Sequence, residues 1–404
     1  MGSFARAPHA LVIGGSLGGL FTANLLLKQG WDAEVFEHSG EDLVGRGAGI
    51  IPHPELFEAL ARIGIPLDDS FGVDIPERVT FDRRGAVIGR LPLRQNLTTW
   101  GRLYQLLKAA FPAERYHFGH SFQRLDADPR GVIAHFTNGA AARGDLLIGA
   151  DGIRSSVRAA LAPEVRPTYA GYVAWRGLAD ENALTPEIHR DLFPKFAFCL
   201  PAREQMLGYP VAGFTNSTRL GSRCYNFVWY RPTDASDGMR RLCTDASGRL
   251  HELSIPPQLI RPEVLAEVRS AAEDLLSPQF AAVVRHTRQP FFQAIFDLES
   301  RNIAFGRVAL LGDAGFVARP HCGMGVTKAA GDAMRLADTL RTAENDVPAA
   351  LGAYEQERAR FGAAVVAHAR ELGAFLQGHN TEEARRHHTP EAVMREIAVT
   401  RDFV

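Results

Sequence analysis

The stretch Gly312–Ala333, GDAGFVARPHCGMGVTKAAGDA, combines residue types that could hold a flat, negatively charged ligand. It follows the strand-like run RVALL and continues into a helical pattern from Val326. Gly323 and Gly325 would let a ligand approach the backbone, and Pro320 would fix the chain before them. The first turn of a helix presents unpaired N–H groups and the positive end of the helix dipole, which favour an anion. The stretch therefore predicts an anion-binding turn at the start of a helix.

His321 lies inside this stretch and could carry a proton, because histidine is the side chain that titrates near neutral pH. As a general base it would have to lie within hydrogen-bond reach of the proton that it removes. The alternative is a loop histidine whose ring nitrogens bond the backbone. The sequence leaves both interpretations open.

The N-terminal segment has the layout of a dinucleotide-binding βαβ unit. A short apolar strand, Leu11–Ile13, leads into the turn GGSLGG and a helical pattern, and a second strand ends at Glu37. Gly14 permits a tight turn and Gly19 lets the helix pack on the strand, while the N–H groups of the helix can bind a pyrophosphate. Glu37 stands where a carboxylate accepts hydrogen bonds from a ribose. Ser16 replaces the second glycine of the usual pattern, and its small side chain leaves room for a phosphate.

Another turn, between these two in the sequence, follows the strand-like run Leu146–Ile148. Asp151 and Gly152 end the strand, and Ser155 and Arg158 belong to the start of a helix. Taken alone, this pattern also fits an ordinary capped helix, because Asp and Ser are both favoured at helix N-termini.

Together the three turns resemble those of the single-component FAD-dependent aromatic hydroxylases, the para-hydroxybenzoate hydroxylase-like family. GGSLGG is similar to the ADP-binding turn of that family, DGIRSSVR to its DG motif and Gly312–Ala333 to its GD motif. The resemblance covers about residues 1–360. One departure is that Gly315 and Phe316 stand where the family usually has Ala-His. The segments RPH, YAGYVAWRG and YNFVWYR look most like the pyridine-hydroxylating branch, that of 2,6-dihydroxypyridine 3-hydroxylase.

The resemblance implies that the chain binds FAD with residues of all three turns. Glu37 would bind the FAD ribose and the first glycine turn its pyrophosphate. Asp313 would hold the ribityl or ribose side, and Arg102 would lie near the phosphates unless it is an ordinary surface arginine of a helix. The full expected cofactor-binding set is Gly14, Gly15, Ser16, Leu17, Gly19, Glu37, His38, Arg46, Arg102, Asp151, Arg158, Asp313, Pro320, Gly323, Met324, Gly325 and Val326.

Arg46, in the glycine-flanked segment VGRGAGI, would approach the edge of the isoalloxazine ring and is expected, with His321, to be catalytic. Asp151 and Arg158 would link flavin binding to NAD(P)H binding. Because the chain has no second dinucleotide fingerprint, NAD(P)H would bind without a Rossmann domain of its own.

The middle of the chain, roughly 168–290, is typical of a β-rich lobe. In CYNFVWY the side chains alternate, so that Tyr225 and Phe227 share one face of a strand, and Tyr209 belongs to a neighbouring strand. One face must cover the flavin in a hydroxylase, which makes Tyr209, Tyr225, Phe227 and His321 the expected substrate contacts. The alternative for such aromatic residues is the core of the sheet.

The predicted fold is α/β, with a discontinuous Rossmann-like FAD domain, an inserted and mainly antiparallel β-sheet substrate lobe, and C-terminal helices. The polar C-terminal segment, with His387 and His388, is expected to be peripheral and solvated, and no metal site is expected. The expected boundaries are 1–70, 98–167 and 291–340 for the FAD domain, 71–97 and 168–290 for the substrate lobe, and 341–404 for the C-terminal helical segment.

Composition excludes several classes of protein. A net charge of −1 over 404 residues leaves no broad basic surface for nucleic acid. The sequence has no run of about 18 apolar residues, so no membrane span is predicted. The four cysteines are scattered without a CxxC pair, which indicates a reducing, cytoplasmic environment. A homodimer is left open.

The resemblance implies an NAD(P)H-consuming monooxygenase that uses FAD and O2 to hydroxylate a small, electron-rich aromatic or N-heteroaromatic ring, hydroxypyridine- or phenol-like, through a flavin C4a-hydroperoxide. Two alternatives remain. One is a flavoprotein reductase or oxidase of the same fold, and the other is a non-catalytic FAD-binding protein.

Overall fold

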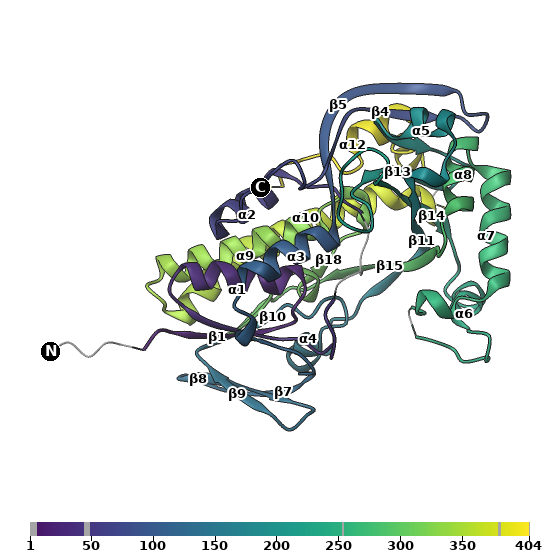
Figure 1. Cartoon of the computed structure of the whole chain (residues 1–404). Helices are drawn as coiled ribbons and strands as arrows, with labels where there is room; N and C mark the ends of the chain where they lie inside the picture. Colours follow the sequence, from purple (N-terminus) through teal and green to yellow (C-terminus); the bar gives the residue numbers. More distant parts are fainter. Residues whose placement is uncertain (1–5, 44–48, 253, 379–380, 404) are drawn as a thin grey trace.

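Two large β-sheets organise the chain. The structure, a computed structural model, describes residues 6–43, 49–252, 254–378 and 381–403. One sheet has six strands and the other has nine. The long helix α10 (Val347–Gly373) contacts strands of both sheets and so joins them (Figure 1).

The six-stranded sheet is parallel except for the strand at one edge. Its central strands are continuous apolar runs because both faces are covered, as is typical of parallel sheets. Helices α1 (Leu17–Lys28) and α9 (Gly325–Thr342) lie on one side, and a small three-stranded sheet lies on the other (Figure 1). In spatial order the six strands are β16 (Ala304–Phe305), β17 (Val308–Leu310), β10 (Leu146–Gly149), β1 (His9–Ile13), β2 (Asp32–Phe36) and β6 (Tyr116–His117). The small sheet consists of β7 (Phe122–Asp128), β8 (Gly131–Phe136) and β9 (Ala141–Gly144).

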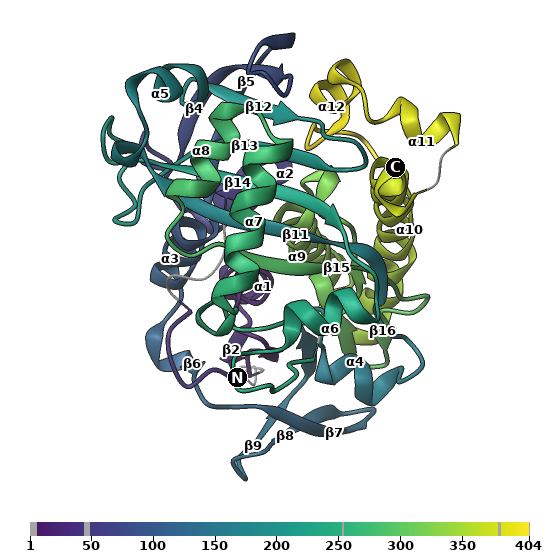
Figure 2. The same ribbon diagram turned by 90° about the vertical axis from the view of Figure 1, so that its right-hand side faces the viewer.

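The nine-stranded sheet is mainly antiparallel, with one parallel pair between β12 and β4. One face is covered by α7 (Pro262–Leu275) and α8 (Pro278–His286), which cross the strands in Figure 2. In spatial order the nine strands are β18 (Phe316–Val317), β15 (Phe291–Glu299), β11 (Thr168–Asp180), β14 (Cys224–Pro232), β13 (Gln205–Val211), β12 (Lys195–Cys199), β4 (Val73–Phe81), β5 (Val87–Thr99) and β3 (Gly49–Ile50).

The other face of the nine-stranded sheet, called here the inner face, packs against the start of α9 and against α10. Tyr172, Tyr209 and Tyr230 lie on this face together with Met324 of the α9 turn. The predicted α/β architecture, with an inserted antiparallel sheet and C-terminal helices, is therefore confirmed. The remaining helices are α2 (Pro54–Ile63), α3 (Trp100–Ala110), α4 (Ser156–Leu161), α5 (Pro186–Leu192), α6 (Asp237–Cys243), α11 (Glu382–Arg386) and α12 (Pro390–Glu396).

The C-terminal segment differs from the expectation of a peripheral tail. Val393, Met394 and Ile397 are buried against the inner face. His387 is also buried and pairs with the carboxylate of Glu396. Some polar residues of this segment are thus buried, although others, such as Glu391 and Arg395, are exposed, so composition alone gave a wrong impression of the segment. Within the described ranges, no helix is long and apolar enough to cross a membrane.

Candidate active site

The three predicted turns meet at one edge of the six-stranded sheet. The strands β1, β10 and β17 are parallel neighbours, so their carboxyl ends lie together. The backbone N–H of Leu311 donates to the carbonyl of Gly149 at 2.9 Å, and Arg158 donates from Nη1 to the carbonyl of Ala314 at 2.9 Å. Turns that are distant in the sequence are thus fastened directly to one another. In open α/β sheets, this edge is where ligands bind.

The first turn has the backbone geometry that the glycine pattern predicted. Gly14 has φ = +105°, a conformation that favours glycine, and a Cβ on Gly19 would overlap the carbonyl oxygen of Gly14. Glu37, only 2% exposed, accepts a hydrogen bond from the N–H of Gly15 at 2.8 Å. The carboxylate therefore ties the end of β2 to the turn at the start of α1.

The flanking residues of the first turn differ in exposure. Ser16 takes the N-cap position of α1, and its hydroxyl makes no capping hydrogen bond among the described residues. Leu17 is buried. His38 is largely exposed, and its Nδ1 lies 2.8 Å from Oε1 of Glu37. The hydroxyl of Ser16 is therefore available to a phosphate, which fits the substitution of serine for the second glycine.

The second turn is centred on Asp151. Its Oδ2 accepts hydrogen bonds from the N–H groups of Ser156 and Val157 at 2.7 and 3.2 Å, so it caps α4. Its Oδ1 is buried and has no hydrogen-bond partner in the described part of the chain. Burial raises the pKa of Asp151. An unpaired buried carboxylate oxygen is costly, and a ligand hydroxyl or amide would satisfy it.

The third turn forms a cradle at the exposed start of α9. Gly323 has φ = +68°, and around Gly325 no other atom would lie within 4 Å of an added Cβ. Met324 is buried below, while Pro320 and Val326 are half-buried on either side. The space beside Gly325 is therefore open, which leaves room for a ligand at the start of α9, where a helix has unpaired N–H groups.

A fully buried lysine holds this cradle from behind. Nζ of Lys328 donates to the carbonyl oxygen of Phe316 at 2.7 Å and lies 3.3 Å from Oδ1 of Asp313. The side chain of Asp313 is 48% exposed, so its second oxygen can still accept a ligand hydrogen bond. Phe316, which departs from the family pattern, also places its ring 4.5 Å from the ammonium group. Both the ring and the backbone carbonyl of Phe316 therefore contact the lysine of the same motif.

Of two arginines in the expected cofactor-binding set, Arg102 and Arg46, the structure describes only Arg102. Arg102, in the first turn of α3, donates to the hydroxyl of Ser70 at 2.6 Å, and its buried Nε has no partner within the described ranges. Arg46 lies outside the described residues. Gly49, which follows it in β3, donates its N–H to Oδ1 of Asn226 at 3.1 Å. The first residue of β3 therefore contacts a side chain of the inner face.

These residues fit an adenine dinucleotide with a flat ring. The site offers two helix N-termini with glycine turns, a buried carboxylate at the end of β2 and an unpaired carboxylate oxygen on Asp151. Within the described residues, no group of three or more His, Cys, Asp or Glu side chains could hold a metal ion.

His321 is fully buried, and both of its ring nitrogens are engaged. Nε2 lies 2.9 Å from the hydroxyl of Tyr172, and Nδ1 lies 3.2 Å from Oε1 of Gln205. Burial, together with the charge of Arg319, lowers the pKa of His321 to about 3. An amide oxygen only accepts, so the neutral ring donates from Nδ1 to Gln205 and accepts from Tyr172. The histidine is therefore part of a closed network that fixes the orientation of Gln205.

The predicted substrate residues divide between the two faces of the sheet. The alternation along β14 is confirmed, but Tyr225 and Phe227 point into the core under α7 and α8. Tyr209 lies on the inner face, near the backbone of Gly49. The expected contact of Tyr225 and Phe227 with substrate is thus corrected, because the helices α7 and α8 cover their face of the sheet.

Three polar residues of the inner face escaped the sequence analysis. Arg176 Nε, Gln205 Nε2 and Asn226 Nδ2 are buried donors without a hydrogen-bond partner among the described residues. The charge of Arg176 also lowers the pKa of Tyr209 and Tyr230, although burial raises both more strongly. The alternation of side chains along each strand could have found them, because each of these polar residues stands at an inner-face position of an otherwise apolar strand.

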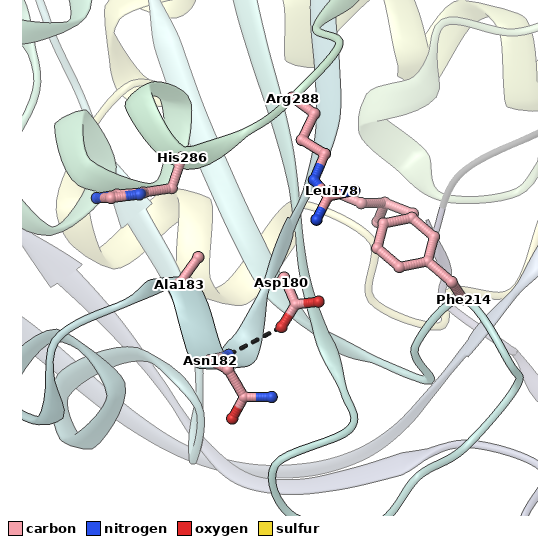
Figure 3. A pocket seen from close by; sticks show the side chains of 7 residues that line it. All are labelled: Leu178, Asp180, Asn182, Ala183, Phe214, His286 and Arg288. Atoms are coloured by element: carbon pink, nitrogen blue, oxygen red, sulfur yellow. Dashed lines mark hydrogen bonds between the residues drawn. The ribbon is translucent and has the colours of Figure 1, made fainter.

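A separate surface pocket of about 300 Å³ lies at the far end of β11 (Figure 3). None of the residues that line it belongs to the predicted site. Its polar groups are Asp180, which accepts from the N–H of Asn182 at 2.9 Å, and the side chains of His286 and Arg288. The pocket is lined by charged side chains, unlike the buried, donor-rich inner face.

Comparisons with known proteins agree with this geometry. A model described as "FAD binding domain" matches residues 279–369, and one described as "FAD binding domain-like" matches residues 169–297. The chain is 31% identical over 370 residues to the 2,6-dihydroxypyridine 3-monooxygenase of Paenarthrobacter nicotinovorans, covering 91% of both chains. The solved 2,6-dihydroxypyridine-3-hydroxylase of Arthrobacter nicotinovorans superimposes with a TM-score of 0.87 at 31% identity, over 95% of this chain and 96% of that one.

A second solved structure, Klebsiella pneumoniae HpxO complexed with FAD and uric acid, has a TM-score of 0.76 and 25% identity, over 94% of this chain and 91% of that one. The likeness spans nearly the whole chain in each case. The chain belongs to the family of FAD-dependent aromatic hydroxylases.

Proposed function

We propose that this FAD-dependent monooxygenase hydroxylates an electron-rich hydroxypyridine- or phenol-like ring with NAD(P)H and O2 as co-substrates. The observation that carries the proposal is the set of three unpaired buried donors, Arg176, Gln205 and Asn226, on the inner face beside the cradle. Unpaired buried donors are costly unless a ligand satisfies them. A ring that bears hydroxyl or oxo groups supplies the acceptors that these donors lack.

In this proposal, the residues at the edge where the three turns meet would hold the cofactor. Glu37 would bind the ribose, the turn from Gly14 to Gly19 the pyrophosphate, and the N–H groups at the start of α9 the flavin. Arg102, Asp151 and Asp313 would bind the intervening part, and Arg46 the flavin ring. Bound FAD supplies the redox chemistry that carries electrons from NAD(P)H to O2 and an oxygen atom to the ring.

The inner face binds and orients the substrate in the proposed reaction. Arg176 and Asn226 donate to the ring oxygen, and the positive charge of Arg176 favours its deprotonated, more electron-rich form. Gln205 donates from Nε2 because His321 holds its amide oxygen. His321 therefore acts as a positioning group here, since its neutral ring has no free nitrogen. Tyr209 and Tyr230 close the apolar walls and exclude water.

The test starts from the purified, yellow protein. NAD(P)H consumption is followed with a panel of hydroxypyridines and phenols, and the product is analysed after reaction under ¹⁸O₂. We expect substrate-stimulated oxidation and one labelled oxygen atom in the product. Oxidation without label would instead favour a reductase or oxidase. Bound FAD without turnover on any compound would favour a non-catalytic FAD-binding protein.

A further inference from the structure

Residues 397–400 of the C-terminal segment pack directly behind the flavin cradle. The backbone N–H of Ala398 donates to the carbonyl oxygen of His321 at 2.8 Å. The hydroxyl of Thr400 lies 3.2 Å from Nδ1 of His53. Gly323 has no room for a side chain, because an added Cβ would lie 2.8 Å from Cβ of Ala398 and 3.2 Å from Nε2 of His53. The segment 397–400 thus forms a back wall for the cradle.

The backbone of this wall includes a residue in an unfavourable conformation, which neighbouring contacts must stabilise. Ala398 has φ = +51°, in the left-handed region that an alanine rarely adopts. Such strain costs about 1 kcal/mol or more and requires surrounding contacts that hold it. The structure provides these contacts from a distant strand.

Arg78, on β4, is fully buried and supplies the contacts. Its Nη1 donates to the carbonyl oxygens of Met394 and Ile397 at 3.0 and 2.7 Å, and its Nη2 donates to that of Ala398 at 3.0 Å. Nε donates to Oε1 of Gln95 at 2.8 Å. The planar guanidinium group therefore binds three carbonyl oxygens within residues 394–398, with a fork of donors that a lysine ammonium lacks.

This arrangement is expensive for a purely structural contact. A buried guanidinium loses its hydration, and burial lowers the pKa of Arg78 to about 9. Within the described residues it forms no ion pair, and its compensation comes from carbonyl and amide oxygens and from the ring of Phe196, 4.5 Å away. An apolar side chain of similar size would avoid this desolvation cost, but it would leave the carbonyl oxygens of Met394, Ile397 and Ala398 without this donor.

We propose that Arg78 is a positioning residue for the FAD cradle, which it holds in shape through the C-terminal segment 397–400. The guanidinium fixes the left-handed Ala398, the N–H of Ala398 fixes the carbonyl of His321, and the turn through Gly323 is thereby set for the flavin. The proposal rests on FAD binding and is independent of the substrate.

The first experiment compares Arg78→Met and Arg78→Lys with wild type. FAD is titrated into the apoprotein, and hydrogen–deuterium exchange is measured on residues 320–326 without flavin. We expect Arg78→Met to raise the FAD dissociation constant about tenfold and to speed exchange in the cradle, since hydrogen bonds to a charged group are lost. Arg78→Lys should recover only part of the loss.

Two controls separate positioning from general destabilisation. Arg94→Met removes an exposed arginine from the neighbouring strand β5, where it pairs with Asp74. Val283→Ala creates a cavity in the core under α8, on the opposite face of the sheet. Both should leave the FAD dissociation constant and cradle exchange at wild-type values, although Val283→Ala lowers the melting temperature. If Arg78→Met lowers the melting temperature but leaves both measurements unchanged, as Val283→Ala does, the proposal is overturned.

A second pair of variants tests the link itself. Ala398→Pro removes the N–H that donates to His321 and cannot adopt a positive φ. Ala398→Gly keeps the N–H and adopts that φ freely. We expect Ala398→Gly to bind FAD about tenfold more tightly than Ala398→Pro, the equivalent of one lost buried hydrogen bond. Equal affinities would contradict the proposal, and this pair decides the matter if Arg78→Met fails to fold.

Discussion

The six-stranded and the nine-stranded sheets build their halves of the site by different means. At the edge of the six-stranded sheet, the site consists largely of backbone: glycine turns, helix N-termini and the carboxylates that brace them. On the inner face of the nine-stranded sheet, it consists of side chains that alternate with core residues along each strand. The first half is set by local conformation and the second by which face the rest of the protein covers. This difference explains why a common cofactor and a variable substrate can share one fold.

The largest expected effect is at the backbone half. In Gly19→Val, the new side chain would overlap the carbonyl oxygen of Gly14 and force the turn open. Overpacking of this kind costs about 1–3 kcal/mol, so we expect FAD affinity to fall by up to about a hundredfold. The purified variant should be nearly colourless, and titration of the apoprotein with FAD gives the constant.

Gly352→Ala in α10 is the matched control, because nothing lies within 4 Å of its added Cβ and its φ is ordinary. It should bind FAD as wild type does and melt slightly higher, since alanine stabilises a helix by about 1 kcal/mol relative to glycine. Wild-type colour in Gly19→Val would refute the claim that backbone geometry defines this half.

The next effect is at the side-chain half. Arg176→Met removes the charged donor of the inner face but no contact of the glycine turns. Hydrogen bonds to charged groups contribute about 1.5–3 kcal/mol, so kcat/KM for the aromatic substrate should fall by about ten- to a hundredfold. FAD affinity should not change. The deficit should shrink as the pH rises, because the substrate hydroxyl then ionises without help from the arginine.

Arg288→Met, in the surface pocket of Figure 3, serves as the control for loss of a cation near the same strand. We expect it to change kcat/KM by less than about twofold, as for other exposed charges. If Arg176→Met weakened FAD binding and substrate use equally, the two halves of the site would not act independently.

A smaller effect concerns His321, where the two halves meet. Its pKa is about 3 in the folded protein, against an ordinary value of 6.5. The depressed pKa means that the unfolded chain binds the proton more readily, so the stability contribution is complete above pH 6.5 and is lost as the pH falls toward 3. Between pH 7 and pH 5, the loss is about 2 kcal/mol.

The measurement is urea unfolding of wild type and His321→Gln at both pH values. Glutamine can still form hydrogen bonds with its neighbours but does not titrate in this range. From pH 7 to pH 5, the free energy of unfolding of the variant should therefore fall by about 2 kcal/mol less than that of wild type. An identical pH dependence in the two proteins would show that folding does not lower the pKa of His321, so that it titrates near its ordinary value. That result would reopen its assignment as a proton carrier.

The sequence predicted the backbone half well because its constraints are local. A positive φ at Gly14 and the contact at Gly19 require glycine wherever the rest of the chain lies. Parity also predicted correctly which residues of β14 share a face. It could not say which face the helices α7 and α8 would cover, because that depends on segments far along the chain.

The C-terminal segment was misjudged for the same reason. Its polar residues indicated a solvated surface, but His388 bonds the carbonyl of Glu204 at 2.8 Å, and Arg78 holds the backbone of 394–398. A lone arginine in a strand carries no sequence signal of such a partner. Long-range polar contacts were therefore the part of the site that sequence patterns missed.

The smallest expected effect is that of Tyr225→Phe, which tests which face of the nine-stranded sheet contacts the substrate. Tyr225 is fully buried on the face under α7 and α8, and its hydroxyl has no hydrogen-bond partner among the described residues. Tyr225→Phe removes only that hydroxyl, so FAD affinity and kcat/KM should stay within about twofold of wild type. The melting temperature should stay the same or rise, because an unpaired buried polar group is removed without leaving a cavity.

Tyr209→Phe, the matched change on the inner face, should instead alter KM or kcat for the substrate. A large loss of activity in Tyr225→Phe with no loss in Tyr209→Phe would reverse the assignment of the faces, since the two tyrosines stand on neighbouring strands and differ mainly in the side to which they point.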